Sequence, residues 1–325
     1  FRAHPIPGDI LFVNKGTPGR VCLVPDPVDF CIAQDMIALR ADESKIYPKY
    51  LFAVLRSREI QQQIYNTNVG DVIPHFKKQF LDQLLIPIPE RSIQESIGDL
   101  YYVLSLKAER NKKINDNLAD LLQTVYQERF GDTSLIANQG ILSDICSYSR
   151  DKVAVSELNV STYFSTENML SGKAGSTEAT SLPTTSQTTA CHKGDTLISN
   201  IRPYFKKIVY CEDKCGCSTD VLCFTPSQPC YSAYLFSTLY ADKFFAFMVA
   251  GSKGTKMPRG DKQQIMTYPV VLPSEEELAG FNTIASPLLE QIYSNSAENK
   301  RLSILRDTLL PKLMSGEIDV SAIQL

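Results

Sequence analysis

Two segments of the sequence carry basic and aromatic side chains on turn-rich stretches that contain glycine and proline. They are SNIRPYFKKIVY at residues 199–210 and GSKGTKMPRGDK at residues 251–262. Lysine and arginine neutralise phosphates, and arginine, asparagine, serine and threonine on a closely approaching loop can bond to base edges. The segments therefore favour DNA binding, with a solvated basic turn as the alternative for any single residue. The candidate contacts are Ser199, Asn200, Arg202, Tyr204, Lys206, Lys207, Lys253, Lys256 and Arg259.

A similar set of side chains lies near the beginning of the chain, again on segments rich in turn-forming residues. Asn14 belongs to the first of these segments and His75 to the second. The same reasoning makes them candidates for contact with phosphates and bases. The candidate residues here are Lys15, Thr17, Arg20, His75, Lys77 and Lys78.

The chain contains nine cysteines and three histidines. An odd cysteine number, in a sequence that does not start like an export signal, predicts reduced thiols rather than a disulfide framework. Cys211, Cys215 and Cys217, with Cys191 and His192 upstream, could bind zinc. However, their CxxxCxC spacing is not a paired CxxC. We expect ordinary buried or loop cysteines and no metal, with a zinc-dependent enzyme as an alternative that metal analysis tests.

Signatures of common enzymes are missing from the sequence. It has no GxxxxGK[ST] phosphate loop, no GxGxxG after a strand, no HExxH and no GxSxG. The Asn/Asp-Pro-Pro-aromatic tetrapeptide of amino-methyltransferases is also missing. We therefore predict no catalytic residue and no enzymatic activity of the chain itself.

Composition and length predict an ordinary globular protein. A chain of 325 residues with 43% hydrophobic and 21% charged residues suggests two or three domains. No apolar run approaches the length of a membrane span, so we expect a cytoplasmic protein without a membrane partner. The net charge is −3, and residues 275–325 carry 8 acidic against 4 basic groups. Any basic surface must therefore be local.

The chain is an imperfect tandem repeat, in which matching segments follow in the same order at nearly constant offsets. PGDILF at residues 7–12 matches KGDTLI at 193–198, and AQDMIALR at 33–40 matches STDVLCFT at 218–225. Further pairs are YLFAVLRSREI (50–60) with YLFSTLYADKF (234–244), GDVIPHF (70–76) with GTKMPRG (254–260), and IPIPERSIQE (86–95) with YPVVLPSEEE (268–277).

Each copy ends in a long helical pattern. Apolar residues from Ile93 to Val125 follow steps of four and three if Lys107 and Asn111 occupy two positions, which is a coiled-coil seam. The second seam runs from Leu278 to Leu302 with Asn295 and Asn299 in its middle, where polar residues fix register. Pro287 predicts a bend or a fresh start at Ser286. A helix over residues 91–130 would be on the order of 60 Å long, and helices that simply cover a core are the alternative.

The globular parts indicate mixed α/β structure. The stretch at residues 195–225 has strand composition, whereas 48–64 and 232–250 have helical periodicity. We predict domains at residues 1–90 and 134–274, followed by helices at 91–133 and 275–325. The long segment that precedes Lys193 in the second copy has no counterpart before Pro7. We therefore expect the first domain to lack its N-terminal portion, as in a truncated or rearranged allele or a partial record of a longer chain.

The combination resembles the specificity (S) subunit of type I restriction-modification systems. The resemblance is carried by VSELNVSTYFSTENML at 155–170, by CHKGDTLISNIRPYFKKIVY and GSKGTKMPRGDKQQIMTYPVVLP after it, by the two long helices, and by the closing LLPKLMSGEIDV. It implies an α/β (α+β) fold with two target-recognition domains, the first N-terminally incomplete. Two long antiparallel coiled-coil helices separate them in a pseudo-twofold tandem repeat.

The resemblance also implies a function. Each recognition domain would read one half of a split target in double-stranded DNA, and the helices would set the gap. The helices would bind two methyltransferase (M) subunits, which carry S-adenosylmethionine, and motor-nuclease (R) subunits would join for cleavage. The S subunit itself would hold no cofactor. The alternative is a decayed or truncated allele that acts only as a coiled-coil scaffold. Candidate partner contacts are Ile97, Leu104, Leu118, Leu121, Leu288, Ile292 and Leu302.

Overall fold

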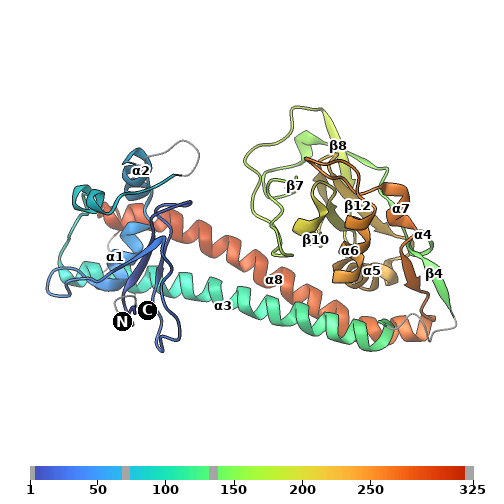
Figure 1. The fold of residues 1–325 in the computed structure, drawn as a ribbon, viewed down its shortest axis with the longest axis horizontal. Helices are drawn as coiled ribbons and strands as arrows, with labels where there is room; N and C mark the ends of the chain where they lie inside the picture. Colours follow the sequence, from blue (N-terminus) through green and yellow to red (C-terminus); the bar gives the residue numbers. More distant parts are fainter. Residues whose placement is uncertain (1–3, 68–73, 132–137, 319–325) are drawn as a thin grey trace. The chain divides into compact units, whose positions relative to one another are not determined.

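The computed structural model describes residues 4–67, 74–131 and 138–318. Within it the chain forms two compact units, shown in Figure 1: unit 1 consists of residues 1–112 and 296–325, and unit 2 of residues 113–295. Two long helices, α3 (Arg91–Phe130) and α8 (Glu275–Met314), each contribute one part to either unit. In the described ranges, no helix combines the length and hydropathy needed to cross a membrane.

Unit 1 contains a small antiparallel sheet covered by helices. Its strands are β1 (Ile10–Val13), β2 (Val21–Leu23) and β3 (Met36–Leu39), in the order β2-β1-β3. The helices α1 (Pro48–Leu55) and α2 (Arg58–Thr67) and the 3-10 helix η1 (Lys78–Gln83) follow. Tyr50, Phe12 and Phe76 are fully buried with apolar residues of α3 and α8, so the long helices are part of this core.

Unit 2 contains two four-stranded sheets and one strand pair. The first sheet has the order β10-β9-β12-β5 and the second β6-β8-β11-β7, while β13 pairs with β4. The strands of the first sheet are β10 (Ile208–Tyr210), β9 (Thr196–Ser199), β12 (Val221–Pro226) and β5 (Cys146–Tyr148). Those of the second are β6 (Lys152–Ala154), β8 (Gln187–Cys191), β11 (Cys215–Cys217) and β7 (Tyr163–Phe164). The pair consists of β13 (Pro269–Val271) and β4 (Gln139–Ile141).

Short helices and 3-10 turns complete the described part of unit 2. The helices are α4 (Leu142–Ile145), α5 (Ser232–Tyr240), α6 (Asp242–Ala250) and α7 (Lys262–Met266). The turns are η2 (Val155–Glu157), η3 (Pro203–Phe205) and η4 (Pro229–Tyr231).

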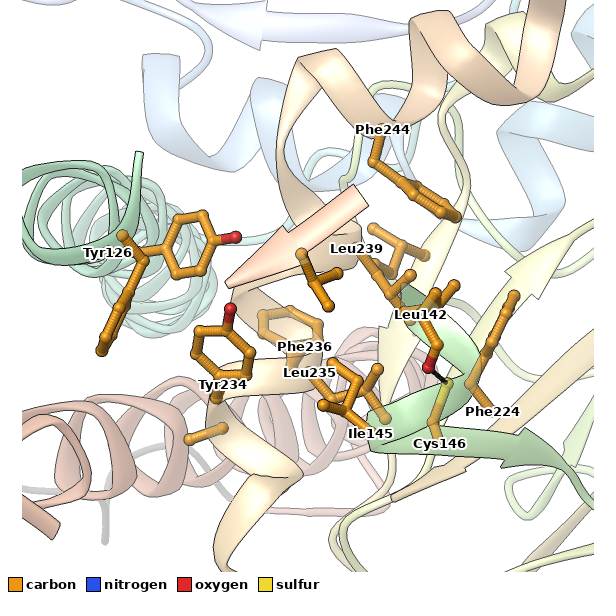
Figure 2. Packing of buried hydrophobic residues seen from close by; sticks show 14 of the residues in the cluster. Tyr126, Leu142, Ile145, Cys146, Phe224, Tyr234, Leu235, Phe236, Leu239 and Phe244 are labelled. Atoms are coloured by element: carbon orange, nitrogen blue, oxygen red, sulfur yellow. Dashed lines mark hydrogen bonds between the residues drawn. The ribbon is translucent and has the colours of Figure 1, made fainter. Parts of the chain in front are cut away.

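Aromatic side chains attach the long helices to the globular part of unit 2. Tyr126 and Phe130 of α3 lie against Tyr234 of α5, with ring centroids 5.7 and 5.0 Å apart, and Phe281 of α8 packs against Phe130 at 5.5 Å. Figure 2 shows Tyr126 facing Tyr234 beside Leu235 and Phe236. Burial of a side chain of this size contributes about 1.5–3 kcal/mol. The helix ends therefore belong to the domain core.

The predicted tandem repeat is confirmed at the level of single hydrogen bonds. The β2-β1-β3 order of unit 1 returns as β10-β9-β12, and α3 and α8 each contain 40 residues. The Tyr50 hydroxyl donates to the Pro87 carbonyl at 3.0 Å, and the Tyr234 hydroxyl donates to the Val271 carbonyl at 2.7 Å. Donor and acceptor are displaced along the sequence by the same number of positions, so the copies share their internal bonding.

The predicted seam of the first helix is correct at its start and wrong further along. Ile97 is fully buried as expected, but Ile114 and Leu121 are 46% and 47% exposed. Leu122, Tyr126 and Phe130 are buried instead. These three residues follow one another at intervals of four, because this part of the helix packs on the globular core rather than on the other helix alone. In addition, a straight helix drifts out of a 3.5-residue repeat.

The predicted polar middle of the seam is confirmed. In unit 1, Asn111 Nδ2 donates to Asn299 Oδ1 at 3.0 Å and to Glu298 Oε2 at 2.6 Å. In unit 2, Asn295 Nδ2 donates to Asn115 Oδ1 at 2.8 Å. Arg306 of α8 lies over the ring of Tyr101 of α3 in unit 1, and Phe281 of α8 packs on Phe130 of α3 in unit 2. Within each unit, residue numbers thus rise on one helix as they fall on the other, so the two helices run antiparallel there.

Of the two outcomes expected at Pro287, the fresh start of a helix at Ser286 is wrong, because α8 runs unbroken from Glu275 to Met314. A proline removes one backbone hydrogen bond, but Ala285 and Leu289 on either side are buried in the core and hold the helix in place. The two stretches with helical periodicity each form two helices rather than one. The break between α1 and α2 consists of residues 56–57 and includes Ser57, whose Oγ accepts the Ile60 N–H at 3.3 Å.

Candidate nucleic-acid interface

The two basic segments predicted in unit 2 lie side by side and are joined by backbone hydrogen bonds. The Arg202 N–H donates to the Pro258 carbonyl at 2.8 Å, and the Gly260 N–H donates to the Asn200 carbonyl at 3.3 Å. Lys253 and Arg259 exchange both backbone bonds at 2.9 Å, which closes the second segment into a hairpin-like loop. We call the paired segments 199–207 and 251–260 the basic face of unit 2.

A third segment, which the sequence analysis missed, supports the first one. The Gly172 N–H donates to the Phe205 carbonyl at 2.8 Å, and the Lys173 N–H donates to the Lys206 carbonyl at 2.9 Å. Lys173, Arg202 and Lys206 all have left-handed backbone conformations, with φ of 63°, 52° and 50°. Such conformations are strained for residues other than glycine and cluster at binding sites. The sequence signal was SGKAG, a lysine between glycines.

Aromatic and apolar side chains project from this face. Tyr204 is 50% exposed and packs on Phe205, with ring centroids 4.7 Å apart. Met257, at the tip of the second loop, is also half exposed. Exposed rings beside cations are suited to stacking on bases or packing against sugars. Tyr204 was predicted as a contact, whereas Phe205 and Met257 were not.

Two buried polar atoms at this face lack a hydrogen-bond partner in the described structure, namely Asn200 Oδ1 and Arg202 Nε. Buried polar groups are nearly always bonded, so unsatisfied ones are exceptions that need a reason. Both belong to residues predicted to contact DNA. A ligand that approaches the loop could satisfy them.

Most cations of the basic face are already engaged within unit 2. Arg259 Nη2 lies 3.1 Å from Asp220 Oδ1, Lys206 Nζ lies 3.0 Å from Asp242 Oδ1, and Lys253 Nζ lies 2.6 Å from Asp261 Oδ2. These carboxylates were not predicted to take part. The sequence alone could not pair them, since Asp220 and Asp242 are distant in the chain from their partners.

Lys207 differs from the other predicted cations. Its Nζ donates to the Thr166 carbonyl at 2.5 Å, and burial lowers the pKa of its ammonium group. This contact ties the first loop to the neighbouring segment. Lys207 therefore positions the loop, whereas Lys256 is exposed at the tip of the second loop and is oriented toward solvent.

A polar cavity of about 330 Å³ opens beside the basic face. Its wall includes Tyr163, Asn168 and three carboxylates, those of Glu167, Glu178 and Asp220. Asp220 thus borders the cavity and also holds Arg259. Because the wall of the cavity carries these carboxylates, the positively charged surface is confined to the two loops of the basic face.

Unit 1 repeats the same loop pairing. The Gly16 N–H donates to the Pro74 carbonyl at 2.9 Å, and the Phe76 N–H donates to the Asn14 carbonyl at 2.8 Å. Lys15 and His75 thereby form an isolated antiparallel β-bridge. Gly16, at the position equivalent to Arg202, is also left-handed, with φ of 84°. We call segments 14–20 and 74–78 the basic face of unit 1. It exposes the predicted residues Lys15, Thr17, Arg20, Lys77 and Lys78, with His75 partly buried.

The predicted partner contacts differ in accessibility. Ile97 is buried in the core of unit 1, and Leu121 is exposed on α3. The others are partly buried: Leu104, Leu118, Leu288, Ile292 and Leu302. The assignment of these residues to a contact with another protein stays a prediction. The assignment of the two basic faces to DNA contact also stays a prediction.

The cysteines form no cross-link and no metal site in the described part of the chain. All nine are free, and Cys191, Cys211, Cys215, Cys217 and Cys223 pack together with Met169 as a buried cluster. Among the residues that the structure describes, no three histidine, cysteine, aspartate or glutamate side chains are placed to share a metal ion.

The N-terminal part of the chain is similar to a known protein family. Residues 3–119 match the family described as type I restriction modification DNA specificity domain. A segment of 73 residues is 34% identical to the type I restriction enzyme MjaIX specificity subunit of Methanocaldococcus jannaschii and covers 22% of this chain. Another, of 49 residues and 15% of this chain, is 45% identical to the HindI specificity subunit of Haemophilus influenzae.

These segments cover 17% and 11% of the lengths of the two relatives. Among solved structures, the S subunit of a type I restriction-modification system from M. genitalium has a similar fold, with a TM-score of 0.60 at 18% identity. The likeness covers 96% of this chain and 84% of that one. Residues 3–119 thus match the type I specificity-domain family, and the resemblance and the mixed fold with two long helices predicted from the sequence are confirmed.

Proposed function

We propose that this chain, as a carrier of a type I restriction specificity domain, is the DNA-recognition subunit of a restriction-modification complex. Each unit reads one half of a split target in double-stranded DNA. The paired helices hold the two units and bind two methyltransferase subunits. The complex acts in the cytoplasm.

One observation carries the proposal: the same backbone-bonded pair of basic loops is built twice. Arg202 with Pro258 in unit 2 and Gly16 with Pro74 in unit 1 make equivalent bonds. Two copies of one reading device suit a target with two halves. The family match and the names of the relatives supply the class of target, since those proteins are specificity subunits.

The residues of each loop pair have separate tasks in this account. Lys256 and the other exposed cations neutralise phosphates and fix the position on the duplex, because phosphate contacts carry no sequence information. Asn200 and Arg202 reach base edges, where asparagine can bond adenine and arginine can bond guanine. Tyr204 packs against the sugar or base edge. Lys207 keeps the loop in place through its bond to the Thr166 carbonyl.

The chain itself carries out no catalytic step. S-adenosylmethionine belongs to the methyltransferase subunits, and motor-nuclease subunits join the same complex for cleavage. Candidate contact residues on the helices include Leu121, which is exposed on α3, and Leu288 and Ile292 on α8. The acidic C-terminal part of the chain is a further candidate partner surface.

The direct test is to change one loop pair and determine the sequence that is methylated. Arg202→Ala and Asn200→Ala, made together in the chain co-expressed with its methyltransferase subunits, should relax one half of the split motif and leave the other intact. The matched variant Lys15→Ala with Thr17→Ala should affect only the other half. A chain that binds the methyltransferase subunits but leaves both halves unchanged in both variants would instead be a scaffold.

A further inference from the structure

The two basic faces are equivalent in backbone but differ in charge. The Asn200 N–H donates to the Asp220 carbonyl at 2.8 Å, as the Asn14 N–H donates to the Asp35 carbonyl at 3.0 Å. Asp220 and Asp35 are therefore equivalent positions. In unit 2 the Asp220 side chain pairs with Arg259.

At two other positions unit 1 has a cation where unit 2 has a carboxylate. Asp261 is the residue that caps the N-terminus of α7, and Lys77 is the cap residue of η1. Asp242 is the first residue of α6, and Arg58 is the first residue of α2. Both pairs have the sequence offset of the two equivalent tyrosine hydrogen bonds. Each exchange changes the local charge by two.

The lysines bonded to Asp242 and Asp261 favour the charged form of these two carboxylates. Hydrogen bonds from Lys173 and Lys206 hold the pKa of Asp242 below its usual range, and a hydrogen bond from Lys253 does the same for Asp261. In the described part of unit 1, by contrast, no carboxylate forms an ion pair with Lys15, Arg20, Lys77 or Lys78. As far as the described residues go, these exposed cations of unit 1 are thus available to phosphates.

We propose that Asp220, Asp242 and Asp261 are specificity-determining residues, which suppress sequence-independent phosphate binding by unit 2. The inference rests on the proposed function. A phosphate that approaches Arg259, Lys206 or Lys253 must replace a carboxylate, so the exchange releases little bound counterion. Non-specific affinity comes mainly from that release. Unit 2 therefore binds DNA only at sites where base contacts add free energy to the replacement of carboxylate by phosphate. Unit 1 supplies the sequence-independent affinity for DNA.

The exchange is feasible because the ion pairs lie at the surface. Arg259 and Lys253 are 58% and 81% exposed. Exposed pairs of this kind contribute little to stability, so a cognate site can open them. The negative wall of the neighbouring cavity, which includes Asp220, acts in the same direction by repelling stray phosphates.

The test measures binding of the full chain, with its methyltransferase subunits where they are needed for solubility, to a labelled duplex of random sequence. Fluorescence anisotropy at salt concentrations between about 50 and 200 mM gives the slope of log affinity against log salt. The variants are Asp220→Asn, Asp242→Asn, Asp261→Asn and the triple combination. Asparagine caps a helix as well as aspartate does, so Asp261→Asn leaves the start of α7 intact.

Each single variant should steepen the slope by about 0.9, and the triple variant by about 2.7, with a several-fold gain in affinity at low salt. Glu157→Gln is the control, because it removes the same charge from an ion pair with Lys214 in unit 2 that lies in neither loop. Unchanged slopes in all four variants, or an equal effect of the control, would overturn the inference while wild-type binding still supports the proposed function. A wild-type protein without salt-dependent DNA binding would overturn both.

Discussion

The polar contact between the long helices in unit 1 allows a quantitative prediction. Asn111 is 3% exposed, and its amide donates to Asn299 Oδ1 and to Glu298 Oε2. Asn111→Ala removes one bond between neutral groups, about 0.5–1.5 kcal/mol, and one to a charged acceptor, about 1.5–3 kcal/mol. We expect unit 1 to lose about 2–4.5 kcal/mol of local stability.

Replacing both partners should have the opposite effect. Asn111→Leu with Asn299→Leu removes this donor and its neutral acceptor together and adds apolar contact, which is usually neutral or stabilising. The Glu298 carboxylate, which is 43% exposed, keeps water and Lys107 as partners. Polar seam residues cost stability and specify register, so the double variant should gain stability but pair its helices less uniquely. The interaction term between the two sites follows from the two single variants and the double variant.

Native-state hydrogen exchange is the suitable assay, because it measures the opening free energy of each segment and does not require two-state unfolding of a two-unit chain. Amides of α3 and α8 around residues 105–111 and 299–305 report on the site. A loss below about 0.5 kcal/mol for Asn111→Ala, or a double variant as unstable as the sum of its single variants, would refute the reasoning.

Three further predictions concern other parts of the molecule. Tyr234→Phe should cost about 1–3 kcal/mol in the urea unfolding of unit 2, because the buried Val271 carbonyl loses its 2.7 Å bond; Tyr231→Phe is the control, and equal losses would contradict the assignment. The hydrogen bond from Arg40 lowers the pKa of Asp9, so the stability that Asp9 contributes is complete above pH 3.8 and is lost as the pH falls through the pKa of the folded state. Burial raises the pKa of Asp195, so its contribution to the stability of unit 2 should increase as the pH falls toward 3.8. Melting temperatures of Asp9→Asn and Asp195→Asn, measured across pH, check both statements. At neutral pH, Asp9→Asn should be destabilised and Asp195→Asn should not. Destabilisation of Asp195→Asn without destabilisation of Asp9→Asn would contradict the pairing of Asp9 with Arg40. Lys256→Ala should reduce the salt slope of DNA binding by about 0.9, and an unchanged slope would remove this residue from the interface.

Much of the fold followed from local patterns in the sequence. Strand composition at residues 195–225 corresponds to β9, β10, β11 and β12, and the repeat predicted the shared sheet order. The helix seam was correct where helix packs on helix, as at Asn111. It failed at Leu121 because another side of α3, the side of Tyr126, packs into the aromatic core of unit 2. A heptad pattern describes the packing of helix on helix and contains no information on packing against such a core.

The candidate site was predictable in its cations but not in their environment. The motif pattern gave Arg202 and Lys256, and the repeat gave the same loops in unit 1. The backbone bonds that join segments far apart in the chain, the support from Lys173, and the ion pair of Arg259 with Asp220 depend on tertiary structure. The N-terminal gap of the first copy and the predicted domain limits stay predictions.

The most direct test of the central claim is a genome-wide map of N6-methyladenine in the source strain with and without this gene. If the chain is a DNA-recognition subunit, its deletion removes methylation at one split motif and leaves all other motifs unchanged, and the lost motif gives the bases read by both units. An unchanged map, obtained with the methyltransferase subunits present and expressed, would contradict the account and leave a scaffold protein in its place.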